Sequence, residues 1–209
     1  MMRALAEGEL RTAHMVASVL LGYPDERLYG ARQVLAEAVD ALPAGEVRDR
    51  LTAFLDHVAG TAQADLAAHY VATFDLKRRC CPYLTYYAYG DTRKRGGALL
   101  RFKHALRAAG FEVADGELPD HLAVVCELSA RGAVREAHRL LREHRAGLEL
   151  LRTALEDERS PYADVVAAVA ATLPPAGPRE KEAALRLAAE GPPAEEVGLE
   201  PYTVTEASR

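Results

Sequence analysis

The chain has 209 residues, of which 49% are apolar and 27% charged, with a formal net charge of -5 at pH 7 and no tryptophan. This composition is typical of a soluble globular protein, and it excludes a collagen-like, a wholly disordered or a disulfide-scaffold protein. Charged residues interrupt each apolar run well before the roughly 20 residues that a membrane-spanning helix needs, and the N-terminus lacks the apolar core of a secretory signal. We therefore expect a cytoplasmic protein without an integral membrane segment.

Apolar residues recur at helical spacing through the first 173 residues. The apolar stripes occupy residues 10–21, 28–42, 47–58, 99–106, 122–128, 134–141, 148–155 and 165–173. No segment alternates with a period of two for long enough to predict a convincing strand. The sequence therefore predicts an all-α fold, a single-domain helical bundle of roughly eight to ten helices over residues 1–173.

The composition changes after Leu173. Residues 174–209 contain six of the eleven prolines and seven acidic against four basic residues. Such a segment buries too little apolar surface to offset the entropy lost on ordering. We expect an extended or partly disordered Pro/Glu-rich tail with one short helix at 181–190.

The three cysteines indicate neither a disulfide framework nor a metal site. Their number is odd, two of them are adjacent at Cys80 and Cys81, and no second cluster of cysteine or histidine stands at zinc-site spacing. Motifs for zinc hydrolysis, for nucleotide phosphates and for a serine nucleophile are also missing. We predict buried apolar cysteines, no metal, no cofactor and no enzyme activity.

Residues 70–111 differ from the rest of the chain. They hold eight of the thirteen aromatic and nine of the twenty-six basic residues, against only two acidic ones. Three submotifs mark this region and the segment that follows it: YVATFD at 70–75, YGDTRKRG at 89–96 and GELPDHL at 116–122. Charge is therefore segregated along the sequence, and the remainder of the chain is strongly acidic.

The first two submotifs are expected to lie at helices. Tyr70 and Phe74 are four residues apart and share a helix face, where either core packing or contact with a partner would explain them. Asp91 or Thr92 is expected to cap the helix that follows, whose first turn then carries the cations at 93–95. Cations there oppose the helix dipole, which indicates a role beyond folding.

The third submotif places Asp120 beside His121. A capping aspartate and a surface histidine are the simplest interpretation. An acid–base pair is the enzymatic alternative, but adjacent residues on a helix point about 100° apart and cannot easily serve one reacting atom. Protonation of His121 near neutral pH is a further hypothesis, by which the affinity for a partner would change.

The three submotifs in this order, together with LGYPDERLY at 21–29, resemble the NarJ-type nitrate reductase assembly chaperones. These belong to the helical maturation chaperones of molybdenum oxidoreductases, and the resemblance covers residues 10 to 173. The sequence departs from the family pattern at Cys81 and Pro82. The matching positions are Tyr70, Phe74, Asp75, Gly90, Asp91, Arg93, Arg95, Gly96, Glu117, Pro119, Asp120, His121 and Leu122.

The resemblance implies a chaperone that binds the N-terminal segment of the apo catalytic (alpha) subunit of a respiratory nitrate reductase. It would hold that subunit competent for insertion of the molybdenum cofactor, with transient contact to the cofactor or its delivery proteins. Helix-in-groove docking would serve this task, and tyrosines suit such a groove because each ring offers apolar area and a hydroxyl. The client-binding residues that this implies are the tyrosines Tyr83, Tyr86, Tyr87 and Tyr89 together with ten of the matching positions, namely Tyr70, Phe74, Asp75, Arg93, Arg95, Glu117, Pro119, Asp120, His121 and Leu122.

Two questions stay open at this point. The basic, aromatic-rich segment 77–107 also fits a nucleotide- or nucleic-acid-binding helical module, although the sequence pI of about 5.8 argues against it. The link at 110–119 carries Gly110, Gly116 and Pro119, which would permit exchange of halves between two chains. We expect a monomer with a domain-swapped dimer as the alternative.

Overall fold

The computed structural model describes residues 5–113 and 116–191. These residues form eleven α-helices, one π-helical segment and one 3₁₀ turn, without a β-strand. In chain order they are α1 (Glu7–Leu20), α2 (Glu26–Asp40), α3 (Glu46–Gly60), α4 (Gln63–Tyr70), the π-helical η1 (Val71–Asp75), the 3₁₀ turn η2 (Arg78–Cys80), α5 (Leu84–Tyr89), α6 (Lys94–Ala108), α7 (Leu122–Ala130), α8 (Val134–Glu143), α9 (Arg145–Asp157), α10 (Tyr162–Ala171) and α11 (Pro178–Glu190). The predicted all-α fold is confirmed.

Local sequence signals explain where the regular helices begin and what they bury. At the start of α2, the Asp25 carboxylate accepts hydrogen bonds from the backbone N–H groups of Arg27 at 2.9 Å and Leu28 at 3.2 Å. The buried face of α2 consists of Leu28, Leu35 and Val39, as the apolar stripe predicts. Short helices such as α5, which has six residues, carry too few turns to show a period.

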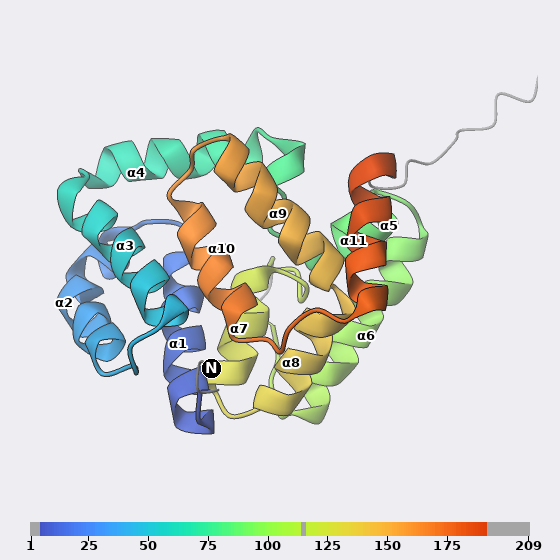
Figure 1. Ribbon diagram of the computed structural model, residues 1–209, viewed down its shortest axis with the longest axis horizontal. Helices are drawn as coiled ribbons and strands as arrows, with labels where there is room; N and C mark the ends of the chain where they lie inside the picture. Colours follow the sequence, from blue (N-terminus) through green and yellow to red (C-terminus); the bar gives the residue numbers. More distant parts are fainter. Residues whose placement is uncertain (1–4, 114–115, 192–209) are drawn as a thin grey trace, which may run out of the picture.

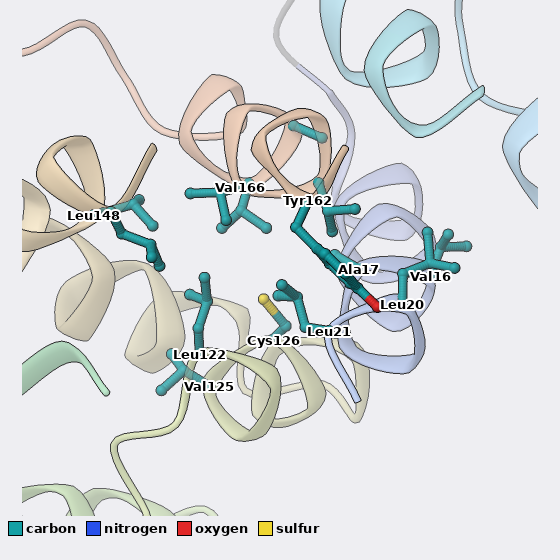
Figure 2. Close-up of a cluster of buried hydrophobic side chains, with 14 of the residues drawn as sticks. Val16, Ala17, Leu20, Leu21, Leu122, Val125, Cys126, Leu148, Tyr162 and Val166 are labelled. Carbon is teal, nitrogen blue, oxygen red and sulfur yellow. The ribbon is translucent and has the colours of Figure 1, made fainter. Parts of the chain in front are cut away.

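The helices pack around one core. Helix α1 lies along α7, and α10 packs against α3 on one side and α9 on the other (Figure 1). Side chains from α1, α7, α9 and α10 meet in the cluster of Figure 2, which includes Leu20, Cys126, Leu148, Tyr162 and Val166. Each of these five residues is almost completely removed from solvent, so this cluster is the central apolar contact of the fold.

Buried polar groups in the core are few and mostly paired. His14 is fully buried, with Nδ1 2.6 Å from Ser129 Oγ and Nε2 2.9 Å from Thr172 Oγ1. Burial lowers its pKa to about 3, so the ring is neutral at pH 7. The predicted buried cysteines are confirmed for Cys80 and Cys126, and burial raises the pKa of the Cys126 thiol to about 12.

The segment after α10 returns along the bundle. It runs past α7 and α8 before α11 begins, and α11 packs against α9 (Figure 1). The helix expected at 181–190 lies within α11, whereas the tail from residue 192 onward is outside the described residues. Among the described helices, none combines the length and the apolar character needed to cross a membrane.

Candidate functional site

The third submotif meets the segment before α5 through backbone hydrogen bonds. The segment before α5 and the segment before α7 form an antiparallel bridge between Tyr83 and His121. Leu84 N donates to the Asp120 carbonyl at 3.0 Å, and Leu122 N donates to the Pro82 carbonyl at 3.0 Å. Two stretches almost 40 residues apart in the sequence are therefore fixed side by side at the starts of two helices.

The buried side chain of Asp120 links the segment before α7 to α5 and α6. Its side chain is 0% exposed, and Oδ2 accepts hydrogen bonds from Thr85 N at 3.1 Å and Thr85 Oγ1 at 2.5 Å. The Arg95 guanidinium places Nη2 3.6 Å from the same oxygen, and its Nε donates to Thr85 Oγ1 at 3.1 Å. The expectation that Asp120 caps the helix after it is wrong, because its carboxylate caps the first turn of α5 instead and pairs with a cation of α6.

His121 takes the capping role at α7. Its Nδ1 accepts a hydrogen bond from Ala123 N at 3.1 Å, which requires an unprotonated nitrogen. Burial lowers the pKa of His121 to about 4, although the charge of Asp120 acts in the opposite direction. The hypothesis that His121 changes its charge near neutral pH is therefore wrong, and its ring is neutral at pH 7.

Tyr83 lies at the centre of the exposed part of the site. The Tyr83 ring is half-buried. The His121 ring meets it edge-on, with 5.1 Å between the two ring centroids, and the Arg95 Cζ lies 5.6 Å from the centroid of the Tyr83 ring. Burial raises the pKa of Tyr83, and the carboxylate of Asp75 adds to that rise. Arg95 of the second submotif and His121 of the third therefore contact the Tyr83 ring, and Asp75 of the first submotif acts on its hydroxyl only through its charge.

The two rings of the first submotif face the core instead. Tyr70 and Phe74 are buried, 4.8 Å apart between centroids, and both contact Tyr162 of α10. The chain between them passes from α4 into η1, and π-helical segments of this kind are frequent at functional sites. The Asp75 side chain at the end of η1 is exposed.

Tyr87 is also a structural residue. It is buried, and its hydroxyl lies 3.0 Å from the carbonyl oxygens of both Arg79 and Cys81, so it fixes the turn before α5. The ring sits so close to α9 that a Cβ at Gly147 would lie 2.9 Å from Tyr87 Cβ. Sequence reasoning missed Gly147 because a glycine inside a helical pattern does not reveal which ring passes over it.

The predicted site residues therefore divide into two sets. The side chains with exposed or half-buried surface are Asp75, Tyr83, Tyr86, Tyr89, Arg93, Arg95, Glu117 and His121. The buried side chains are Tyr70, Phe74, Tyr87, Pro119, Asp120 and Leu122. We call Tyr83, Tyr86, Tyr89 and His121 the tyrosine surface. The buried set builds this surface, and Thr85, which sequence reasoning missed, belongs to that set.

A hollow of about 200 Å³ lies along one side of α7. Its apolar lining comes from the end of α6, the segment after it and α7, and comprises Leu106, Phe111, Val113, Val124 and Leu128. Carboxylates of Glu112, Glu117 and Glu127 line it as well, against one cation, Arg131, which pairs with Glu127 at 2.9 Å. Glu117 of the third submotif lines this hollow, and His121 caps the helix, α7, that supplies Val124 and Leu128 to it.

Many cations of the basic segment are engaged within the chain. Lys77 and Arg79 both pair with Glu158 at the end of α9, and Arg101 Nη2 donates to the Tyr89 hydroxyl at 2.7 Å. Cations held by carboxylates contribute less to phosphate binding than free ones. The nucleotide- or nucleic-acid-binding alternative for segment 77–107 is weakened by this pairing.

Comparisons with known proteins give matches over most of the chain. Residues 40–168 match the family described as "Nitrate reductase delta subunit". The chain is 30% identical to the "probable nitrate reductase molybdenum cofactor assembly chaperone NarJ" of Bacillus subtilis over 78% of this chain and 89% of that protein. It is 31% identical to the nitrate reductase molybdenum cofactor assembly chaperone NarJ of Escherichia coli, over 71% of this chain and 64% of that one.

A longer relative matches this chain over part of its own length. The nitrate reductase-like protein NarX of Mycobacterium tuberculosis is 38% identical over 75% of this chain, which corresponds to 23% of NarX. The chain thus spans about a quarter of NarX and most of the Bacillus NarJ. From the family match over residues 40–168 and the coverage of the Bacillus relative, the chain belongs to the nitrate reductase delta subunit family.

Proposed function

We propose that this protein is a cytoplasmic, non-enzymatic assembly chaperone. It binds the N-terminal segment of the apo catalytic subunit of a respiratory nitrate reductase and holds that subunit competent for insertion of the molybdenum cofactor. Membership of the family and the roles of the two NarJ relatives as cofactor assembly chaperones support the general task. The observation that carries the proposal is the meeting of the second and third submotifs at Tyr83, whose ring contacts Arg95 and His121, together with an apolar hollow lined by Glu117 and two further glutamates.

The site suits an amphipathic helix with basic flanks. The tyrosine surface offers ring area that tolerates partial wetting, and the hollow has room for one apolar side chain of the client. Three carboxylates around the hollow would attract lysine or arginine next to that side chain and would fix the direction of the peptide. Affinity near 1 µM, about -8 kcal/mol, would allow release once the cofactor is inserted.

A non-enzymatic role agrees with the state of Asp120 and His121. The carboxylate of Asp120 is inaccessible, and Nδ1 of His121 is occupied by the cap of α7. The carboxylate of Asp120 is therefore unavailable to transfer a proton to a bound substrate. The described residues also contain no group of three or more potential metal ligands.

Calorimetric titration with a client peptide tests the proposal. The peptide carries about fifteen N-terminal residues of the catalytic subunit, enough for four helical turns. Tyr86→Ala on the tyrosine surface should weaken binding about tenfold, which is about 1.4 kcal/mol. Tyr23→Ala, which truncates an exposed tyrosine before α2, is the matched control and should bind like the unmodified protein.

Two results would contradict the proposal. The first is absence of binding at millimolar peptide, and the second is an equal loss in Tyr86→Ala and Tyr23→Ala. Helical content from circular dichroism must be unchanged in both variants, which is expected because both side chains have exposed surface. Tyr87 is unsuitable for this test, since its buried ring supports the fold.

A further inference from the structure

A second cleft lies away from the tyrosine surface and shares no lining residue with the hollow. It has a volume of about 550 Å³, within the range of small-molecule sites. The start of α3, the end of α10 and the segments at the beginning of the described chain and after α10 surround it. Its aliphatic walls include Leu5, Leu10, Val47, Leu173 and Pro174, and none of the described residues that line it is phenylalanine, tyrosine or tryptophan.

A buried cation forms part of the same wall. Arg145, at the start of α9, is 8% exposed, and its Nη1 donates to the Pro174 carbonyl oxygen. Its Nε has no hydrogen-bond acceptor within the described structure. The nearest carboxylate oxygen, Glu149 Oε1, is 3.9 Å away, and the other oxygen of Glu149 holds Arg152 Nε at 3.0 Å.

This arrangement leaves the guanidinium charge incompletely paired in a desolvated position. Buried charges in proteins are normally paired and hydrogen-bonded, because the loss of hydration is costly. A second nitrogen in the wall, His138 Nε2, is also buried without a partner. The one carboxylate among the lining residues, Glu46, is exposed at the start of α3 and is therefore hydrated.

We propose that this cleft binds an aliphatic carboxylate, with the carboxylate group paired to the Arg145 guanidinium and the acyl chain lying along the aliphatic walls. The cleft is large enough for a small molecule, its aliphatic lining favours an aliphatic over an aromatic ligand, and the underpaired cation favours an anionic over a neutral one. A guanidinium recognises a carboxylate through parallel hydrogen bonds, which adds directional selectivity to the charge. The inference is independent of the proposed chaperone function.

Calorimetry of the full chain with octanoate and with octanamide tests this site, because the two probes differ only in the charge of the head group. Octanoate should bind at a single site at least tenfold more tightly than octanamide. In Arg145→Gln the octanoate affinity should fall at least tenfold while octanamide binding is unchanged. Arg142→Gln, which removes an exposed arginine of α8 outside this cleft, is the matched control and should leave both affinities unchanged.

A second variant keeps the test decisive should Arg145→Gln fail to fold. Ala171→Leu adds bulk to the cleft wall without altering the guanidinium, and it should weaken both probes. The proposal is overturned if octanoate shows no saturable binding at millimolar concentration, if octanamide binds as tightly as octanoate, or if Ala171→Leu leaves octanoate binding unchanged. Retention of octanoate affinity in a folded Arg145→Gln variant would also overturn it.

Discussion

Replacing Asp120 with asparagine should destabilise the protein far more than the same change at Asp91. Both carboxylates approach Arg95, but Asp120 is fully buried and Asp91 is exposed. Asparagine can still accept from Thr85 N and Thr85 Oγ1, so the change removes the charge and not the shape. A hydrogen bond to a charged group contributes about 1.5–3 kcal/mol and a neutral one about 0.5–1.5 kcal/mol, so two weakened bonds cost about 2 kcal/mol.

The lost partner of Arg95 adds to that cost. Without the charge of Asp120, the buried Nη2 atom keeps neither an ion pair there nor a hydrogen bond. We therefore expect Asp120→Asn to lower the free energy of unfolding by about 2–3 kcal/mol, whereas breaking the pair with alanine should cost about 3–5 kcal/mol. Asp91→Asn should cost less than about 0.5 kcal/mol, because exposed ion pairs contribute little.

Urea unfolding followed by circular dichroism measures these differences, and an unchanged m-value shows that the denatured states are comparable. If Asp120→Asn and Asp91→Asn proved equally stable, the contacts of residue 120 with Thr85 of α5 and Arg95 of α6 would not depend on the buried charge. The reasoning on Asp120 would then be refuted.

Three further predictions concern packing and pH. Gly147→Ala should lower the free energy of unfolding in urea by about 1–2 kcal/mol, because the new Cβ would overlap Tyr87. Gly97→Ala in α6 has open space around it and should raise that free energy by up to about 1 kcal/mol. Equal changes in the two variants would contradict this account. His14 takes up a proton near pH 6.5 in the unfolded chain but only near pH 3 in the native state. The free energy of unfolding should therefore fall on acidification below pH 6.5, by up to about 1.4 kcal/mol per pH unit. A His14→Gln variant whose free energy of unfolding falls equally steeply with pH would contradict this. Hydrogen bonds from Arg79 and Lys77 lower the pKa of Glu158 to about 2, so the stabilisation from this carboxylate is present above pH 4.5 and is lost as the pH falls toward 2. In Glu158→Gln the melting temperature should depend less on pH between 4.5 and 2. An unchanged pH dependence of the melting temperature would argue against the pairing.

The regular helices could be predicted from the sequence because their information is local. The stripe of Leu28, Leu35 and Val39 specifies both the existence of α2 and the face that it buries. The same argument worked for α3, whose buried face includes Leu51 and Phe54. A helix with an apolar period needs no knowledge of its partners to be recognised.

The roles within the site could not be predicted in this way, because they depend on contacts between distant segments. The sequence places Asp120 before a helix, where a cap is the reasonable prediction, but the acceptor that it provides serves Thr85, 35 residues earlier. His121 then supplies the cap of α7. Spacing within one segment contains no information on which of two adjacent side chains turns inward.

The predicted exchange of halves between two chains depends on the link at 110–119. Gly110 and Gly116 adopt φ angles of 82° and 94°, a conformation that favours glycine, while residues 114 and 115 lie outside the described residues. Exchange at this link would break the bridge between Tyr83 and His121 within one chain and restore it between two. A swapped dimer would therefore keep the tyrosine surface, and light scattering at several protein concentrations would show a slowly exchanging dimer if this happens.

The division between buried and exposed motif residues gives the clearest test of how the site works. If the buried residues build the surface and the exposed tyrosines make the contact, the two sets must respond differently to substitution. Tyr86→Ala should weaken binding of the client peptide with little change in the free energy of unfolding. Asp120→Asn should lower that free energy, and its effect on binding should disappear when the peptide is measured at low temperature, where the variant is fully folded. A direct contact between the client and Asp120 would instead leave a binding defect in the folded variant.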